Sequence, residues 1–472
     1  MITDQPTRIL ILGGGFAGLE AARVLERLIP DDAPVEITLL NRDNFFLFSP
    51  MLPEVAGSSI DAEHIVSPQR AFVGRTKFRE CEVVSIDLER RAVATVHSIT
   101  KHRHTLQYDH LALTLGSVTN FRDTPGVEDH ALTLKSLADA VLVRDHILAC
   151  LEQAEMETDP ELRKALLTFV VAGGGFSGAE LIAEVLDFAY EACRFYPTIN
   201  REDVRVILIH HGERLLPEIG PELADYALRA LQRRGVEIRL NTGVSSADRS
   251  SVTTDGGERI KTHNLVWTAG VAPSPVVAQL QVEKDRRGAI LVDPYLRARG
   301  RSNVWAAGDC ANVTDPATGQ PYPPTAQHAL RQARTLAYNL AATIRGGELK
   351  PFAFKSPGVL VALGHHSAAA EIWGRRFRGF PAWFLWRSIY LSKLPSVERK
   401  VRVALDWTLD LFFPRNMCQL THLGIRPALR RLAQHHHRQV GVETPAPSDG
   451  ALVVVPSAPD EKRHGPSPGE SG

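Results

Sequence analysis

Two copies of a glycine-rich turn constrain the fold of this chain more than any other feature. The first is Gly13-Gly-Gly-Phe-Ala-Gly18 and the second is Gly173-Gly-Gly-Phe-Ser-Gly178, 160 residues further on. Each has an apolar strand before it, a helix-forming segment after it and a second strand at a suitable distance (8–12, 19–27 and 35–40; 167–172, 179–185 and 204–209). In this order, backbone N–H groups and a helix N-terminus face a pyrophosphate. The chain is therefore predicted to contain two dinucleotide-binding folds.

The residue that ends the second strand of such a unit is usually acidic and bonds the adenosine ribose. Here the two positions hold Asn41 and His210. An asparagine can still bond a ribose hydroxyl. His210, with His211 and Arg214 nearby, is compatible with a 2′-phosphate, so the sequence leaves the choice between NADH and NADPH open. The alternative is that two surface histidines simply end a strand.

Three further segments complete the predicted core. Residues 108–116 and 263–270 are each expected to form a strand that ends at a glycine, and we expect the two to be partners that return the chain between layers. Residues 303–309 end a strand with Asp309 at a glycine turn. A carboxylate at that place can accept hydrogen bonds from the ribitol hydroxyls of a flavin.

Composition excludes several other classes of protein. The 472 residues exceed the usual size of one domain about threefold. Lys+Arg and Asp+Glu both number 54, which argues against a dedicated nucleic-acid binder. The five cysteines form no CxxC pair, so neither a metal site nor a local dithiol is predicted, and free buried cysteines are expected. With no signal peptide and no apolar run near about 20 residues, we expect an intracellular protein without a membrane span.

The C-terminal quarter has a different texture. Residues 380–391 and 401–413 are rich in aromatic residues and helix-like, and 375–415 carry nine basic and three acidic side chains. Apolar faces bordered by Arg and Lys suit helices that lie in the headgroup plane of a membrane. A dimerisation or packing module is the alternative. After residue 443 the chain is mostly Pro, Ser, Gly and Ala, so a disordered tail is predicted.

Taken in order, GGGFAG (13–18), LTLGS (113–117), GGGFSGAE (173–180), VWTAG (266–270) and WAAGD (305–309) resemble the two-dinucleotide-binding flavoproteins. In that superfamily FAD occupies a split first domain and NAD(P)H an inserted second domain. Residues 46–52 and the aromatic C-terminal segments look like the alternative (type II, non-proton-pumping) NADH:quinone oxidoreductases. The resemblance covers about residues 8–415.

The resemblance implies roles for individual residues. Gly13, Gly15 and Gly18 would hold the FAD pyrophosphate and Asp309 the ribitol, while Gly173, Gly175 and Gly178 would hold the NADH pyrophosphate. Glu180, near the nicotinamide, and Gln327, near the quinone, are the predicted catalytic residues. The remaining predicted cofactor contacts are Phe16, Ala17, Asn41, Arg42, Pro50, Val84, Gly116, Phe176, His210, Gly270, Gly308 and Ala326.

One position departs from the family pattern. The family's second glutamine, four residues after the first, is Arg331 here, and Gln332 follows one place later. A shift of one residue rotates a helical side chain by about 100°, so Gln332 is not expected to face the same site. This leaves the electron acceptor open.

We therefore expect an α/β protein with two Rossmann-like domains and a C-terminal membrane-association or dimerisation module. The expected ranges are 1–125 and 273–350 for FAD, 126–272 for NAD(P)H, 351–438 for the module and 439–472 for the tail. The implied reaction transfers electrons from NADH through FAD to a quinone. We expect the protein to be a homodimer bound peripherally to the cytoplasmic face of the cell inner membrane. The alternatives are a soluble, ferredoxin-reductase-like NAD(P)H:acceptor reductase and a redox-sensing flavoprotein.

Overall fold

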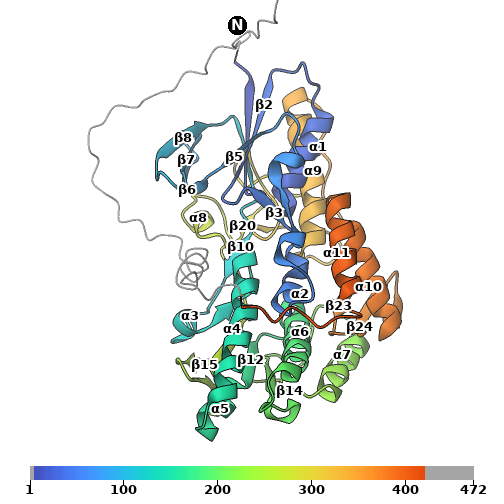
Figure 1. Ribbon diagram of the computed structural model, residues 1–472. Helices are drawn as coiled ribbons and strands as arrows, with labels where there is room; N and C mark the ends of the chain where they lie inside the picture. The colour runs from blue at the N-terminus through green and yellow to red at the C-terminus, as the bar shows by residue number, and fades with distance from the viewer. Residues whose placement is uncertain (1–4, 420–472) are drawn as a thin grey trace, which may run out of the picture. The chain divides into compact units, whose positions relative to one another are not determined.

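Two parallel five-stranded sheets organise the chain (Figure 1). The computed structural model describes residues 5–419, so the predicted tail and residues 420–438 of the predicted C-terminal module lie outside the described part. The first sheet has the order β21-β9-β1-β2-β5 (Val304–Ala306, His110–Leu113, Thr7–Leu12, Val35–Asn41, Lys77–Glu80). The second has the order β11-β18-β12-β13-β14 (Leu132–Thr133, Asn264–Trp267, Thr168–Ala172, Arg205–Ile209, Val236–Arg239).

The first sheet is completed only after the second has formed along the chain. Strand β21 pairs in parallel with β9, although all five strands of the second sheet lie between them in sequence. The central strands β1 and β12 are almost wholly apolar and buried, as expected for strands covered on both faces. The predicted fold class, a first Rossmann-like domain split by a second, is therefore confirmed.

The predicted partnership between residues 108–116 and 263–270 is wrong. Strand β9 pairs with β1 in the first sheet, and β18 pairs with β12 in the second, so the two occupy equivalent places in different sheets. The chain crosses between the halves immediately afterwards, where β10 (Ser117–Thr119) pairs antiparallel with β19 (Val271–Pro273). Both strands therefore end earlier than expected, and the residues just beyond the predicted segments form this connection.

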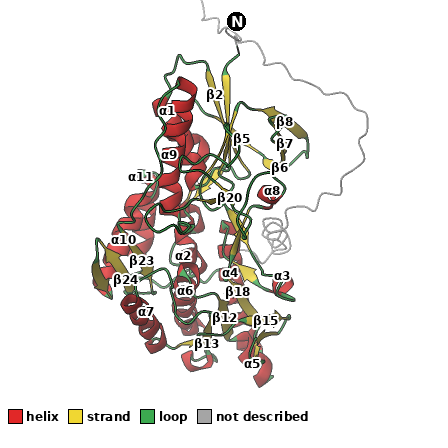
Figure 2. Cartoon of the chain, turned by 180° about the vertical axis from the view of Figure 1, so that it is seen from behind, coloured by secondary structure: helices red, strands yellow, loops and turns green. Residues whose placement is uncertain are grey.

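Long helices cover the sheets (Figure 2). Helix α1 (Phe16–Leu28) follows the first glycine turn and packs against α9 (Ala326–Arg345), and α6 (Phe176–Ala192) follows the second turn. The other helices of these two halves are α2 (Leu52–Ala56), α3 (Val127–His130), α4 (Leu137–Met156), α5 (Pro160–Leu166), α7 (Pro221–Arg233) and α8 (Pro275–Ala278). The smaller strands are β3 (Phe45–Leu47), β4 (Val66–Pro68), β6 (Glu82–Asp87), β7 (Ala92–Val96), β8 (Arg103–Gln107), β15 (Val244–Ala247), β16 (Ser251–Thr254), β17 (Arg259–Lys261), β20 (Ile290–Leu291) and β22 (Ala311–Asn312).

The C-terminal module combines a small sheet with two helices. The antiparallel strands β23 (Gly358–Ala362), β24 (Ala368–Ile372) and β25 (Arg375–Arg378) precede α10 (Phe380–Lys393) and α11 (Val397–Leu409). Both helices were predicted, and the sheet was not. Among residues 5–419, no helix is both long and apolar enough to cross a membrane.

Buried polar contacts join the end of this module to α2 and α6. The Arg415 side chain is only 3% exposed and donates from Nη1 to the Gly57 carbonyl at 2.8 Å and to the Glu184 carboxylate at 3.0 Å. Its Nε also donates to Asp410 at 3.2 Å. On α11, the Trp407 indole donates to Glu54 at 3.0 Å. Removing one partner of a buried ion pair leaves the other charge uncompensated.

Arg415→Ala is therefore expected to lower the free energy of unfolding by about 3–5 kcal/mol. Arg402→Ala removes an exposed pair with Glu398 on α11 and serves as the control, with an expected cost of about 0.5 kcal/mol or less. Urea unfolding followed by tryptophan fluorescence measures both. Equal losses in the two variants would contradict the anchoring role of Arg415.

Candidate active site

In the first glycine turn, two of the three motif glycines are closely packed and the third faces open space. Gly13 has a φ of +97°, and a Cβ there would lie 2.3 Å from the Thr114 carbonyl oxygen. A Cβ on Gly18 would lie 1.8 Å from the Gly13 carbonyl oxygen. A Cβ on Gly15 would meet no atom within 4 Å, so only Gly15 faces open space. This is the arrangement that lets a pyrophosphate approach a helix N-terminus.

The second turn repeats this geometry at its first and last glycines, whereas a Cβ on Gly175 would lie 3.4 Å from the Glu218 carboxylate. Gly173 has a φ of +116°, and a Cβ on Gly178 would again lie 1.8 Å from the carbonyl oxygen at the start of the turn. The Thr268 hydroxyl donates to Ala172 at 2.9 Å, as Thr114 donates to Leu12 at 2.8 Å in the first copy. These threonines were not singled out from the sequence. Their signal is a shared Thr-x-Gly, which ends the LTLG and WTAG segments alike.

The residues in the ribose positions point back into the turns. Asn41 accepts a hydrogen bond from the Gly14 N–H at 2.8 Å, and Nδ1 of His210 accepts one from the Gly174 N–H at 3.1 Å. The accepted bond fixes the neutral His210 ring with its proton on Nε2. His210 is buried, and burial lowers its pKa. The interpretation as two surface histidines is thus wrong for His210 and fits only the exposed His211.

A cavity of ≈ 470 Å³ adjoins the first turn at the carboxyl ends of β1 and β2. Gly13, Asn41 and Arg42 line it, as predicted for a cofactor site. Predicted Val84 is half-buried, and its neighbour Val83 lines the cavity instead. The register of β6 against β7 shifts between Val83 and Ser85, so Val84 stands at an irregularity of the strand.

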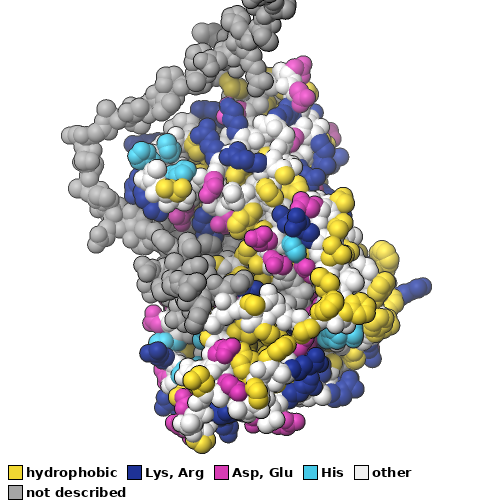
Figure 3. Space-filling model, viewed as in Figure 1, with side chains coloured by type: hydrophobic (Ala, Val, Ile, Leu, Met, Phe, Trp, Pro, Cys, Tyr) yellow, Lys and Arg dark blue, Asp and Glu magenta, His cyan; other side chains and the backbone are white. Residues whose placement is uncertain are grey.

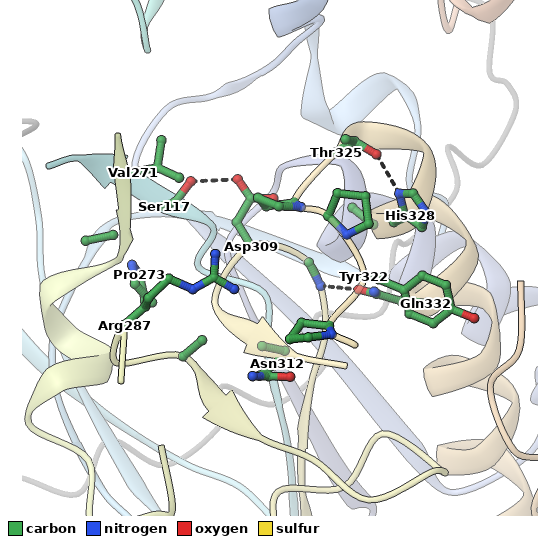
Figure 4. A pocket seen from close by; sticks show the side chains of 18 residues that line it. Ser117, Val271, Pro273, Arg287, Asp309, Asn312, Tyr322, Thr325, His328 and Gln332 are labelled. Carbon is green, nitrogen blue, oxygen red and sulfur yellow. Dashed lines mark hydrogen bonds between the residues drawn. The ribbon is translucent and has the colours of Figure 1, made fainter. Parts of the chain in front are cut away.

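Asp309 lies in a smaller pocket of ≈ 40 Å³ where the two halves of the first domain meet (Figure 4). Its carboxylate accepts a hydrogen bond from the Ser117 hydroxyl at 2.6 Å, and the Lys135 ammonium lies 3.7 Å away. The neighbouring Gly308 N–H donates to Gln332 at 2.8 Å. Asp309 and Gly308 therefore contact three polar side chains, those of Ser117, Lys135 and Gln332. These three residues were not predicted from the sequence as cofactor contacts.

Near the start of α9, the residues of the predicted quinone segment point to different partners. Gln327, next to Ala326 at the helix start, donates to the Ser356 hydroxyl at 2.8 Å. Gln332 is instead turned toward Gly308, as the one-residue shift predicts. The guanidinium of Arg331 lies over the Phe354 ring, 5.2 Å from its centre. A cation therefore occupies the place where the family pattern has a neutral amide.

Glu180 lies on the first turns of α6, at the contact with the C-terminal module. Its side chain is enclosed, with the residue 8% exposed, and its carboxylate accepts a hydrogen bond from the Ala362 N–H at 3.0 Å. Burial raises the pKa of Glu180 to about 8. The group is therefore largely protonated at neutral pH and can act as a hydrogen-bond donor there.

An aromatic cluster lies beside the first turn. The Phe16 ring lies 5.0 Å from that of Phe46 and 5.8 Å from that of Phe48, and Phe48 contacts Tyr390 of α10 at 6.2 Å. In the sequence analysis, Tyr390 appears only in the aromatic-rich segment 380–391. No local sequence feature predicts its contact with Phe48. Of the other predicted contacts, Ala17 and Phe176 lie in the first turns of α1 and α6, Pro50 lies in the short helix 49–51, and Gly116 and Gly270 directly precede β10 and β19.

Two family models match consecutive parts of this chain. One is described as Pyridine nucleotide-disulphide oxidoreductase and matches residues 7–333, and the NDH2 C-terminal domain matches residues 357–416. A type II NADH:quinone oxidoreductase of Mycobacterium tuberculosis is 32% identical, with 88% of this chain and 90% of the relative covered. The chain belongs to the type II NADH:quinone oxidoreductase family.

Other comparisons agree with this family. A probable NADH dehydrogenase of Dictyostelium discoideum is also 32% identical, over 87% of this chain and 90% of the relative. The fold matches NDH2 of Plasmodium falciparum, solved in complex with NADH, with a TM-score of 0.79, 19% identity, and coverage of 88% of this chain and 100% of that one. As expected, all five cysteines are free, three of them buried, so the dithiol of the disulphide reductases has no counterpart.

The raised pKa of Glu180 predicts a dependence of stability on pH. Above its ordinary pKa of 4.5 the unfolded chain releases a proton that the folded protein retains up to about pH 8. The free energy of unfolding is therefore expected to fall as pH rises through this interval. Glu180→Gln should remove this contribution, so that the variant gains stability relative to the parent at pH 8 but not at pH 4.5.

Denaturant titrations at the two pH values measure this difference, and Glu398→Gln on the exposed face of α11 is the control. An equal pH dependence in parent and Glu180→Gln would show that Glu180 is ionised in the folded protein.

Proposed function

We propose that this protein oxidises NADH and transfers the two electrons, through bound FAD, to a membrane quinone without pumping protons. The observation that carries the proposal is the pair of complete glycine turns in two separate sheets, joined to a C-terminal module and lacking a dithiol. Two turns provide sites for two dinucleotides. The free cysteines favour transfer from the flavin directly to an external acceptor.

FAD fits the first turn. The open space at Gly15 accommodates a pyrophosphate, the adjoining cavity accommodates a nucleoside, and Asp309 supplies a carboxylate for ribitol hydroxyls. Lys135, which lines the same cavity, adds a positive charge. When bound, FAD accepts a hydride and passes on two electrons. The chain's own part is to orient the two substrates and exclude water.

NADH is assigned to the second turn. Gly173, Gly175 and Gly178 would hold its pyrophosphate, with the N-terminus of α6 stabilising the negative charge. Glu180 follows on the same helix and is our proposed positioner of the nicotinamide, as Gln327 is of the quinone. The neutral His210 presents no carboxylate to the ribose, so NADPH is tested beside NADH.

The membrane surface is the proposed location of the acceptor. Exposed apolar side chains run along α10, α11 and the residues after them, where Figure 3 shows hydrophobic atoms gathered: Phe380, Phe384, Val397, Val401, Leu405, Leu409, Leu411, Phe412 and Phe413. Arg375, Lys393 and Arg402 are exposed in the same module. A basic and apolar face suits anionic headgroups. We propose that this surface binds the inner face of the cell membrane. The alternative is that the same surface forms the contact between the subunits of a homodimer.

Rapid mixing of the FAD-loaded protein with NADH is expected to bleach the flavin within milliseconds to seconds, and a short-chain quinone should restore its absorbance. Parallel mixing with NADPH measures nucleotide preference. Bleaching without recovery by quinone would favour a soluble reductase with another acceptor. Slow recovery with every acceptor would favour a redox sensor, and no bleaching by either nucleotide would refute the enzyme.

Membrane docking is tested with vesicles that contain anionic lipid. The double variant Phe384→Glu/Leu405→Glu is expected to lose at least about tenfold in vesicle affinity, because two apolar contacts become charged. Ile99→Glu, at a still more exposed apolar residue between β7 and β8, is the control outside the C-terminal module and should bind as the parent does. Sedimentation with vesicles measures affinity, and light scattering of the free protein reports whether the substitutions change a dimer instead.

A further inference from the structure

Six charged side chains are buried where α2 and α6 meet the C-terminal module. The carboxyl groups are those of Glu54, Glu180, Glu184 and Asp410, and the guanidinium groups are those of Arg387 and Arg415. Arg387 is the most accessible of them, with 12% of its side chain exposed. Four potential negative charges therefore share one enclosed region with two positive charges.

The arginines are not shared evenly among the acids. Arg415 bonds Glu184 and Asp410, at 3.0 and 3.2 Å, and the Arg387 guanidinium lies 3.8 Å from Asp410. Glu54 receives only the Trp407 indole N–H, on one oxygen. Its second oxygen is buried and has no hydrogen-bond partner in residues 5–419. Glu180 receives the Ala362 N–H.

This imbalance requires bound protons. An uncompensated charge in a protein interior costs several kcal/mol, and carboxyl groups avoid the cost by staying protonated. Arg415 also lies 3.6 Å from the part-exposed Glu191, so its charge is shared among three carboxylates. Neither arginine forms an ion pair within 4 Å with Glu54 or Glu180, so these two acids are the ones expected to hold protons. Burial and the nearby Glu184 carboxyl raise the pKa of Glu54 well above its ordinary value, against the opposing effect of Arg387.

Other groups around Glu54 do not change this count. Helix α2 packs against α4 as well as α6, and α4 contributes the Arg144–Asp145 pair, which is buried and neutral as a pair. The third neighbour is the aromatic side of α10. Tyr390 is stacked on Trp386 with ring centres 4.4 Å apart, and both Glu180 and Glu54 raise the pKa of Tyr390 after burial itself. Tyr390 therefore lies close to both acids and, through Phe48, to the first turn.

The proposed reaction consumes one proton. Hydride transfer from NADH supplies two electrons and one hydrogen nucleus, whereas reduction of a quinone to a quinol forms two O–H bonds. The balance is NADH + quinone + H⁺ → NAD⁺ + quinol. One proton per turnover must therefore come from solvent and reach a quinone in a site from which water is excluded.

We propose that Glu54 is a proton-relay residue, which takes this proton from the solvent side of the buried cluster and passes it through Glu180 and Tyr390 toward the quinone. The proposal rests on the proposed quinone reduction. Glu54 does not touch a substrate in this arrangement and acts through the neighbouring groups. A purely structural alternative exists, in which Glu54 only anchors α11 through Trp407.

Three variants separate the two roles. Glu54→Gln keeps an acceptor for the indole and removes the titrating proton, Glu54→Asp keeps the acid, and Trp407→Phe removes the anchor while leaving the acid. Rapid mixing follows NADH oxidation and quinone reduction as separate steps from pH 5 to 9. Infrared titration of the protein without substrates follows the C=O band of protonated carboxylic acids.

In Glu54→Gln we expect quinone reduction to slow about 100-fold, a typical contribution of positioned proton transfer, and far more than NADH oxidation. Part of the carboxylic-acid band should disappear, imidazole added as a soluble proton donor should restore part of the rate, and Glu54→Asp should recover most of it. Trp407→Phe should keep both the band and the rate.

Unchanged quinone reduction in Glu54→Gln would overturn the relay. So would an equal loss in Trp407→Phe with no change of the carboxylic-acid band, because that result assigns Glu54 to anchoring alone. Failure of the parent protein itself to reduce quinone, with NADH oxidation intact, would instead overturn the proposed function and this inference with it.

Discussion

The ionic contacts of Arg415 are the constraint on which the arrangement of the site depends. This single side chain bonds residues that precede α6, belong to α6 and follow α11, so it ties the end of the C-terminal module to the nucleotide-binding half. Trp407 bonds Glu54 and lies 6.1 Å, ring to ring, from Trp386 of α10, so the same group of contacts also positions α10. In this arrangement Tyr390 of α10 reaches the aromatic cluster at the first turn.

The two glycine turns satisfy their polar backbone groups in the same way. In each copy a threonine hydroxyl and a strand-end acceptor satisfy polar groups of the turn, leaving the helix N-terminus for a ligand. The acceptors differ, since one is an amide and the other an imidazole. A carboxylate in that place would also bond ribose hydroxyls. The Asn41 amide can still bond one, whereas the neutral His210 ring offers no carboxylate and keeps only the geometry of the turn.

The sequence was sufficient for features that depend on local chemistry. Glycine spacing predicted both turns and the helices after them. The family resemblance implied the split of the first domain, and the departure from the family pattern at Arg331 and Gln332 predicted that Gln332 turns away. Features set by tertiary contacts were missed. Strand β24 is mainly alanine, with Ile372 as its single β-branched residue, so its strand signal is weak. Strands β9 and β18 look like partners because both are apolar. The burial of His210 and the side of β6 that faces the cavity depend on neighbours distant in sequence.

The burial of Glu54 is another feature that depends on tertiary contacts. In the sequence it is one glutamate of a short helix, and only the approach of α6 and α11 makes it a buried acid without an arginine. Replacing buried ionic groups by apolar ones of similar size is often neutral or stabilising. A cluster with two acids in excess of its arginines therefore lowers stability as pH rises, and packing alone gives no reason for it. Its position between α6, where we propose that the nicotinamide binds, and the aromatic side of α10 supplies a reason, because the proposed reaction consumes a proton.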